Sequence, residues 1–194
     1  MPPKIKNTKK DIVKAAVEIA RENGAEAINA RAIAAALNCS TQPIFSNFAT
    51  MDELQKAVVA AAYECYLGFI KSEVESGEYP KYKSFGMAYI RFAKEERELF
   101  KLLFMCDRQE KDLTPTLDFE SSVQMIMSAN GITKEIAELM HLEMWAFVHG
   151  IATMFATSFL SLEWELISEM LSDVYQGLRA KHLKGETKNE CHYD

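Results

Sequence analysis

Apolar residues recur with the period of an α-helix along nearly the whole chain, and this pattern limits the fold more than any other feature. Between residues 8 and 22, one helical face collects Ile12, Val13, Ala16, Val17, Ile19 and Ala20. Such a face predicts an amphipathic helix, and no segment shows the alternation of apolar and polar residues that marks a half-buried β-strand. The sequence therefore predicts an all-α fold.

Capping residues and turn residues set the expected ends of these helices. Thr8 with Asp11 and Thr50 with Glu53 have the spacing of capping boxes, and Asn29 is a suitable N-cap. The expected helices cover residues 8–22, 30–37, 40–48, 51–76, 81–94, 96–105, 116–129, 133–159 and 161–183, with Ser40, Thr133 and Ser161 as further N-caps and a polar loop at 107–115.

Charge is distributed unevenly along the 194 residues, whose formal net charge is −6. Residues 1 to 48 hold seven basic groups against four acidic ones, a net charge of +3 that leaves −9 for the remainder. A basic N-terminal segment followed by an acidic remainder indicates two functions in one chain. The function of the basic segment can involve nucleic acid.

Cysteine positions and hydropathy indicate the compartment. The four cysteines stand at 39, 65, 106 and 191, too far apart for a CxxC metal site or a dense disulfide framework. Free thiols fit a reducing cytosol. The basic N-terminus is not followed by an apolar signal segment, and the most apolar stretch, residues 145 to 160, is too short to span a bilayer. We expect a cytoplasmic protein without a membrane partner.

Residues 30 to 48 have the spacing of a helix-turn-helix, because two short predicted helices are joined by only a few residues. Ala34 is small enough to let the helices approach closely. Asn38 falls in the turn, where a positive φ is expected and where Asn is better tolerated than most residues. The apolar positions Ile33, Leu37, Ile44 and Phe48 are expected to form a compact core.

The remaining side chains of the second short helix face outward and are of the types that contact base edges and phosphates. We expect Ser40 to cap the Gln42 amide, which would make Pro43 the third helical residue, where no intrahelical bond is lost. The basic run from Lys4 to Lys10 is expected to act as a phosphate-seeking arm. The predicted DNA-binding residues are Lys9, Lys10, Arg31, Ser40, Thr41, Gln42, Phe45, Ser46 and Asn47.

Four runs follow one another here: Ile28-Asn29-Ala30-Arg31-Ala32-Ile33-Ala34, Asn38-Cys39-Ser40, Ile44-Phe45-Ser46-Asn47-Phe48 and Met51-Asp52-Glu53-Leu54. In this order they resemble the DNA-binding domain of the TetR family of bacterial transcriptional repressors, over residues 8 to 60. The resemblance implies an N-terminal three-helix DNA-binding domain, expected at 1–54, and a C-terminal helical bundle for ligand binding and dimerisation at 55–183. Residues 184–194 are expected to form a flexible tail.

The chain also departs from the family's usual pattern. Asn38 stands in place of the turn glycine and Phe45 in place of a common tyrosine, while Ala49 and Met51 occupy positions where members often carry lysine. We therefore expect DNA binding that is specific but makes few phosphate contacts, with the arm at residues 4–10 compensating in part.

Methionine and aromatic side chains are abundant in the C-terminal part. They form core by default, but they also line adaptable apolar pockets. The run Trp145-Ala146-Phe147-Val148-His149-Gly150 resembles a Trp-x-x-x-His-Gly signature of one TetR subclass. We expect Tyr89 and His149 to anchor an apolar or aromatic ligand. The predicted pocket residues are Tyr89, Phe92, Phe104, Met125, Met144, Phe147 and His149.

The predicted function is a one-component transcriptional repressor that binds a near-palindromic operator as a homodimer and is released by a small ligand. One alternative is a helical ligand-binding or interaction protein whose helix-turn-helix no longer binds DNA. Another is a helical-bundle enzyme, for which Glu138 and His141 supply one ExxH fragment of a di-iron site. Because no second fragment, nucleophile motif or phosphate loop is visible, no enzyme activity, metal or cofactor is expected.

Overall fold

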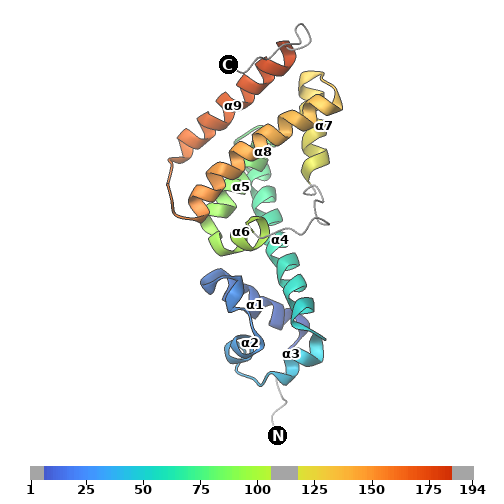
Figure 1. Cartoon of the computed structure of the whole chain (residues 1–194), viewed down its shortest axis with the longest axis vertical. Coiled ribbons are helices and arrows are strands. Elements are labelled where there is room, and N and C mark those ends of the chain that lie inside the picture. Colours follow the sequence, from blue (N-terminus) through green and yellow to red (C-terminus); the bar gives the residue numbers. More distant parts are fainter. Residues whose placement is uncertain (1–6, 106–117, 185–194) are drawn as a thin grey trace, which may run out of the picture. The chain divides into compact units, whose positions relative to one another are not determined.

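The computed structural model describes residues 7–105 and 118–184. Every regular element in these two ranges is helical, which confirms the all-α fold class. The elements are α1 (Lys9–Asn23), η1 (Ala25–Ala27), α2 (Ala30–Ala36), α3 (Gln42–Asn47), α4 (Met51–Ser76), α5 (Lys81–Glu95), α6 (Arg97–Phe104), α7 (Asp118–Asn130), α8 (Lys134–Ala156) and α9 (Trp164–Lys184). Figure 1 labels the helices α1 to α9. The loop expected at 107–115 and nearly all of the tail expected at 184–194 lie outside the described residues.

Short-range capping bonds begin α1 as the sequence predicts. The Asp11 amide donates to the Thr8 hydroxyl at 3.2 Å, and the Thr8 amide donates to the Asp11 carboxylate at 2.9 Å. These bonds form a capping box, and the hydrogen bond from Thr8 lowers the pKa of Asp11. Gly24, with a φ of 83°, ends the helix because glycine takes this conformation without steric cost.

Helix α8 ends earlier than the expected Phe159. Ser158 has a φ of 57°, and its amide donates to the Phe155 carbonyl. The Phe159 amide reaches the Met154 carbonyl at 3.0 Å, which completes a Schellman-type end. Glycine usually occupies the left-handed position of this motif, so a serine there gave no stop signal in the sequence.

Helix α9 begins at Trp164, and the expectation that Ser161 caps it is wrong. The first backbone bond of the helix runs from the Ile167 amide to the Glu163 carbonyl at 3.1 Å. Residues 157–163 form the connection after the left-handed turn, so Ser161 lies before the helix.

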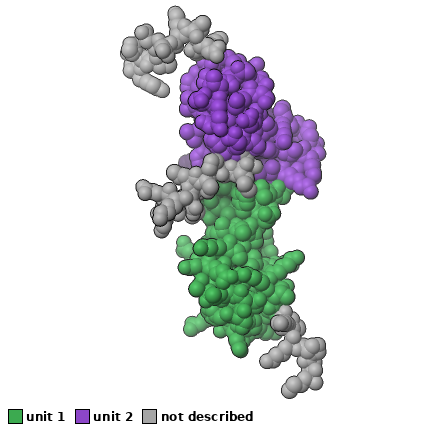
Figure 2. All heavy atoms as spheres, turned by 90° about the vertical axis from the view of Figure 1, so that its right-hand side faces the viewer, with its two compact units in different colours: residues 1–69, 92–107 green, residues 70–91, 108–194 purple. Residues whose placement is uncertain are grey.

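The chain divides into two compact units, coloured green and purple in Figure 2. Unit 1 comprises residues 1–69 and 92–107, and unit 2 comprises 70–91 and 108–194. This division differs from the expected boundary after residue 54, because part of α4 and all of α6 group with α1 to α3. Within unit 1, the Arg21 guanidinium donates to the Glu96 carboxylate at 2.7 Å, and this bond ties α1 to the start of α6.

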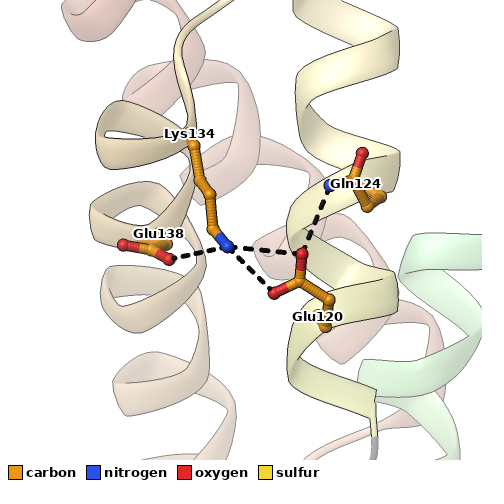
Figure 3. Close-up of polar contacts among 4 residues, drawn as sticks. All are labelled: Glu120, Gln124, Lys134 and Glu138. Carbon is orange, nitrogen blue, oxygen red and sulfur yellow. Dashed lines mark hydrogen bonds and ion pairs between the residues drawn. The ribbon is translucent and has the colours of Figure 1, made fainter.

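Unit 2 has a core of its own between α7 and α8. Its buried residues are Val123, Ile126, Ile132, Ala137 and Met140. At the surface beside this core, the Lys134 ammonium lies between the carboxylates of Glu120, at 3.3 Å, and Glu138, at 3.8 Å (Figure 3). Exposed ion pairs of this kind contribute little to stability, so the apolar core holds the two helices together.

No helix in residues 7–105 and 118–184 combines the length and the apolar character that crossing a membrane requires.

His141 is a titratable group packed against aromatic rings of unit 2. Its Nδ1 shares a hydrogen bond of 3.0 Å with the Tyr82 hydroxyl, and its ring lies edge-on to Tyr82 and Phe119. Burial disfavours the charged form and lowers the pKa of His141 to about 4. The histidine is therefore neutral in the fold at pH 7.

We expect unit 2 to lose stability as the pH falls from 7 to 4. Unfolded His141 takes up a proton near pH 6.5, whereas folded His141 does so only near pH 4, so protons favour unfolding between these values. The slope is at most about 1.4 kcal/mol per pH unit and is reduced by the partial exposure of the ring. Urea unfolding at several pH values measures this slope, and His141→Phe should reduce it. An equal slope in the wild type and in His141→Phe would contradict the role given to His141.

Candidate nucleic-acid interface

Two short helices, α2 and α3, are joined by a turn at residues 37–41. The Asn29 side chain caps α2 by accepting the amides of Arg31 at 3.1 Å and Ala32 at 2.9 Å, as predicted. Asn38 has the expected positive φ, at 49°. The Cys39 amide then returns to the Ala34 carbonyl at 2.9 Å. These local bonds fix the direction in which the chain enters α3.

A small apolar core holds the two helices. Ile33 and Ile44 are fully buried, and Phe48 is 1% exposed. Leu37 is only half-buried, so three of the four predicted core residues fill the interior. Cys39, in the turn, is half-buried. Helix α1 contacts both α2 and α3, and these contacts hold the two short helices within unit 1.

The start of α3 differs from the prediction. Thr41 is the N-cap, without a side-chain capping bond, and Ser40 is exposed, so Ser40 does not cap the Gln42 amide. The Thr41 carbonyl accepts the first helical amide, from Ile44 at 3.1 Å, and the helix therefore begins one residue later than expected. Pro43 becomes the second helical residue, where no intrahelical bond is lost.

The outward face of α3 combines an amide with an aromatic ring. Gln42, Phe45 and Ser46 are exposed, and Thr41 and Asn47 are half-buried. The Ser46 hydroxyl donates to the Gln42 carbonyl at 2.9 Å, and the Asn47 amide nitrogen donates to the Pro43 carbonyl at 2.8 Å. Ser46 and Asn47, two of the predicted contact residues, therefore donate hydrogen bonds to backbone carbonyls of their own helix.

Gln42 and Phe45 are two of the exposed predicted contacts on α3. Within the described chain the Gln42 side-chain amide has no hydrogen-bond partner, and Phe45 is 52% exposed. An amide that can donate and accept, next to an uncovered ring, is suited to contact a base edge.

The basic residues of unit 1 differ in whether a carboxylate neutralises their charge. The Lys9 ammonium pairs with the Glu53 carboxylate at 2.8 Å and lies 4.6 Å from the centre of the Phe48 ring. The bond from Lys9, together with that from the Ala49 amide, lowers the pKa of Glu53. Lys10 and Arg31 are exposed, with no ion pair in the described part of the chain. Lys4 and Lys6 of the predicted arm lie outside it.

Lys14 joins this basic surface and was not among the predicted contacts. An open groove of about 500 Å³ between α1 and α4 is lined by Lys9, Lys10, Val13, Lys14, Val17, Ala57 and Ala61. Lys10 and Lys14 are four residues apart, and this spacing places them on one helical face. The same spacing in the sequence could have indicated their shared position.

The predicted ligand-pocket residues fall in both units. Phe92 and Phe104 belong to unit 1, where their ring centres lie 5.4 and 5.3 Å from that of Tyr66. The other predicted residues belong to unit 2: Met144 and Tyr89 are buried there, and Met125, Phe147 and His149 are half-buried.

The two predicted polar anchors of unit 2 are bonded to each other. The Tyr89 hydroxyl lies 2.9 Å from Nδ1 of His149, and the Trp145 ring stacks on the His149 ring with their centres 4.9 Å apart. In the part of the chain that is described, no three His, Cys, Asp or Glu side chains group as metal ligands. His141 and Glu138 instead contact Tyr82 and Lys134.

Comparison of the sequence with protein-family models and with curated proteins found no match. A short helix with a buried Ile44 presents an amide and a ring to solvent, and the exposed cations Lys10, Lys14 and Arg31 belong to the same unit.

Proposed function

We propose that the chain is a transcriptional regulator, acting as a repressor, whose unit 1 binds double-stranded DNA through α3. The observation that carries the proposal is the exposed face of Gln42 and Phe45 on a short helix that the turn at Asn38 and the buried core hold in place. Helix-turn-helix proteins read the major groove with the second helix of such a pair. Arg31 and Lys10 would contact phosphates, and α3 would contact bases.

We further propose that the regulator acts as a homodimer in the cytoplasm. Helix α8 exposes an apolar row formed by Leu139, Leu142 and Trp145. Clustered apolar side chains that remain exposed on a chain are typical of interaction surfaces. A two-fold axis through this row would place the same residues of two copies against each other and supply two reading helices. Such a dimer matches a near-palindromic operator.

In this proposal a small apolar or aromatic ligand binds unit 2 and releases the operator. The Tyr89 hydroxyl and the His149 ring provide polar groups among buried apolar side chains, as ligand sites require. The ligand would act by binding one dimer geometry more tightly than the other.

Selection with the purified full-length chain tests the function. Random double-stranded DNA is enriched on the protein, and the bound sequences are read. We expect a near-palindromic site with half-sites about 34–36 Å apart or a multiple of this distance. Failure to enrich any sequence above non-specific binding would contradict the proposal.

Other observations favour a second candidate, an interaction protein that does not bind DNA. The charge of Lys9 is neutralised by Glu53, and the donors of Ser46 and Asn47 bond within α3. Fewer groups then remain for phosphates and bases. The same selection separates the two candidates, because only a regulator enriches an operator.

Gln42→Ala is expected to weaken binding to the selected operator by about 1–3 kcal/mol, because a bidentate contact to a base is lost. Non-specific DNA should be bound as before. Gln55→Ala is the matched control, since Gln55 is an exposed glutamine of the same unit on α4. Titrations with operator and scrambled DNA measure the difference. A loss of equal size on both sequences would remove the base-reading role of Gln42.

A further inference from the structure

The exposed face of α3 presents two side chains with different chemistry, one helical turn apart. Gln42 can donate and accept hydrogen bonds, whereas the ring of Phe45 can do neither. Phe45 is nevertheless 52% exposed, while Ile44 beside it is fully buried. An apolar ring on this face can bury its surface against an apolar group of a bound partner.

On the major-groove edges of the four base pairs, the apolar group is the 5-methyl of thymine. We propose that Phe45 packs against a thymine methyl while Gln42 forms a bidentate contact with adenine. The inference rests on the proposed function and specifies its DNA partner. Each operator half-site then contains an adenine for Gln42 and a thymine for Phe45, and a G·C pair at the second position is disfavoured because it offers no methyl.

The spacing of Gln42 and Phe45 along α3 limits the distance between the two bases that they can contact. Three residues advance an α-helix by roughly 4.5 Å, and successive base pairs are roughly 3.4 Å apart. Phe45 and Gln42 therefore reach the same, adjacent or next-but-one base pairs. The neighbouring donors of Ser46 and Asn47 bond to backbone carbonyls within α3, so we assign the reading of this step to Gln42 and Phe45.

Deoxyuridine tests the thymine contact, because it pairs like thymidine and lacks only the methyl. Each thymine of the selected operator is replaced in turn, and the dissociation constant is measured for the wild type, Phe45→Ala and Phe45→Tyr. For the wild type we expect about a fourfold loss at one thymine per half-site, the size of one buried methyl, and roughly fifteenfold when both half-sites are changed. Phe45→Ala should bind both operators alike, and Phe45→Tyr should keep the preference.

The adenine contact has its own test. 7-Deazaadenine removes the N7 acceptor while keeping the base pair, so it should weaken the wild type but not Gln42→Ala. Melting temperatures serve as folding controls, and we expect them to be unchanged, because both side chains are exposed.

Two results would overturn the inference alone. Either no thymine of the selected operator shows a methyl effect, or Phe45→Ala loses as much affinity as the wild type when uracil is introduced. In the second case another residue reads the methyl. If no operator is selected at all, the proposed function fails, and the inference fails with it.

Discussion

Leu142→Glu is expected to convert the proposed homodimer into monomers. Leu142 is the middle residue of the exposed apolar row on α8 and is 54% exposed. In a two-fold dimer, its replacement would bring two carboxylates together at an apolar contact. Unfavourable charge pairs of this kind cost several kcal/mol. The dimer dissociation constant should rise at least about a hundredfold, which sedimentation at micromolar concentrations can measure.

Val59→Glu is the matched control for this variant. Val59 is an apolar residue of unit 1 with 40% exposure, so the substitution adds the same charge away from the row. It should leave the dimer intact. Because Leu142 is exposed, the helical content of Leu142→Glu should equal that of the wild type by circular dichroism. A folded Leu142→Glu protein that is still a dimer would place the interface elsewhere.

Phe48→Ala is expected to destabilise unit 1 by about 3–5 kcal/mol, the usual range for a buried aromatic side chain. The ring is 1% exposed, lies at the end of α3 and also contacts the Lys9 ammonium. Its removal leaves a cavity at the C-terminal end of α3, which Phe48 caps. We expect an earlier urea transition together with loss of operator binding.

Phe45→Ala provides the comparison, since the same substitution is made three residues earlier in the same helix. The exposed ring contributes little to the folded state, so the change in stability should remain within about 0.5 kcal/mol. Similar losses in the two variants would show that α3 is not held by the core described above.

Features that depend on residues close in sequence were predicted well. The capping box of Thr8 and Asp11, the cap of Asn29 and the positive φ of Asn38 each arise from a side chain and a backbone group a few residues apart. Such contacts form whenever the local helix forms, so the sequence contains the necessary information. The cap of α3 was wrong because Ser40 and Thr41 are adjacent and either can precede the helix.

Features that depend on distant residues were not predicted. Lys9 and Glu53 are 44 residues apart in sequence, Tyr89 and His149 are 60 apart, and an amphipathic pattern identifies a buried face without naming its partner. The division into units depends on contacts of the same kind. The bond between Arg21 and Glu96 groups α6 with α1, although α6 follows the expected domain boundary by some forty residues.

The pair of Lys9 and Glu53 also has a thermodynamic consequence for association with a polyanion. Binding to DNA releases condensed cations in proportion to the net positive charge that the protein brings to the phosphates. Glu53 acts as a fixed counterion of Lys9, because the Ala49 amide holds the Glu53 carboxylate beside the Lys9 ammonium. The pair of Lys9 and Glu53 carries no net charge. If unit 1 binds DNA as proposed, the described residues that would contribute most to the ionic-strength dependence of binding are Lys10, Lys14 and Arg31, and Lys9 would contribute little.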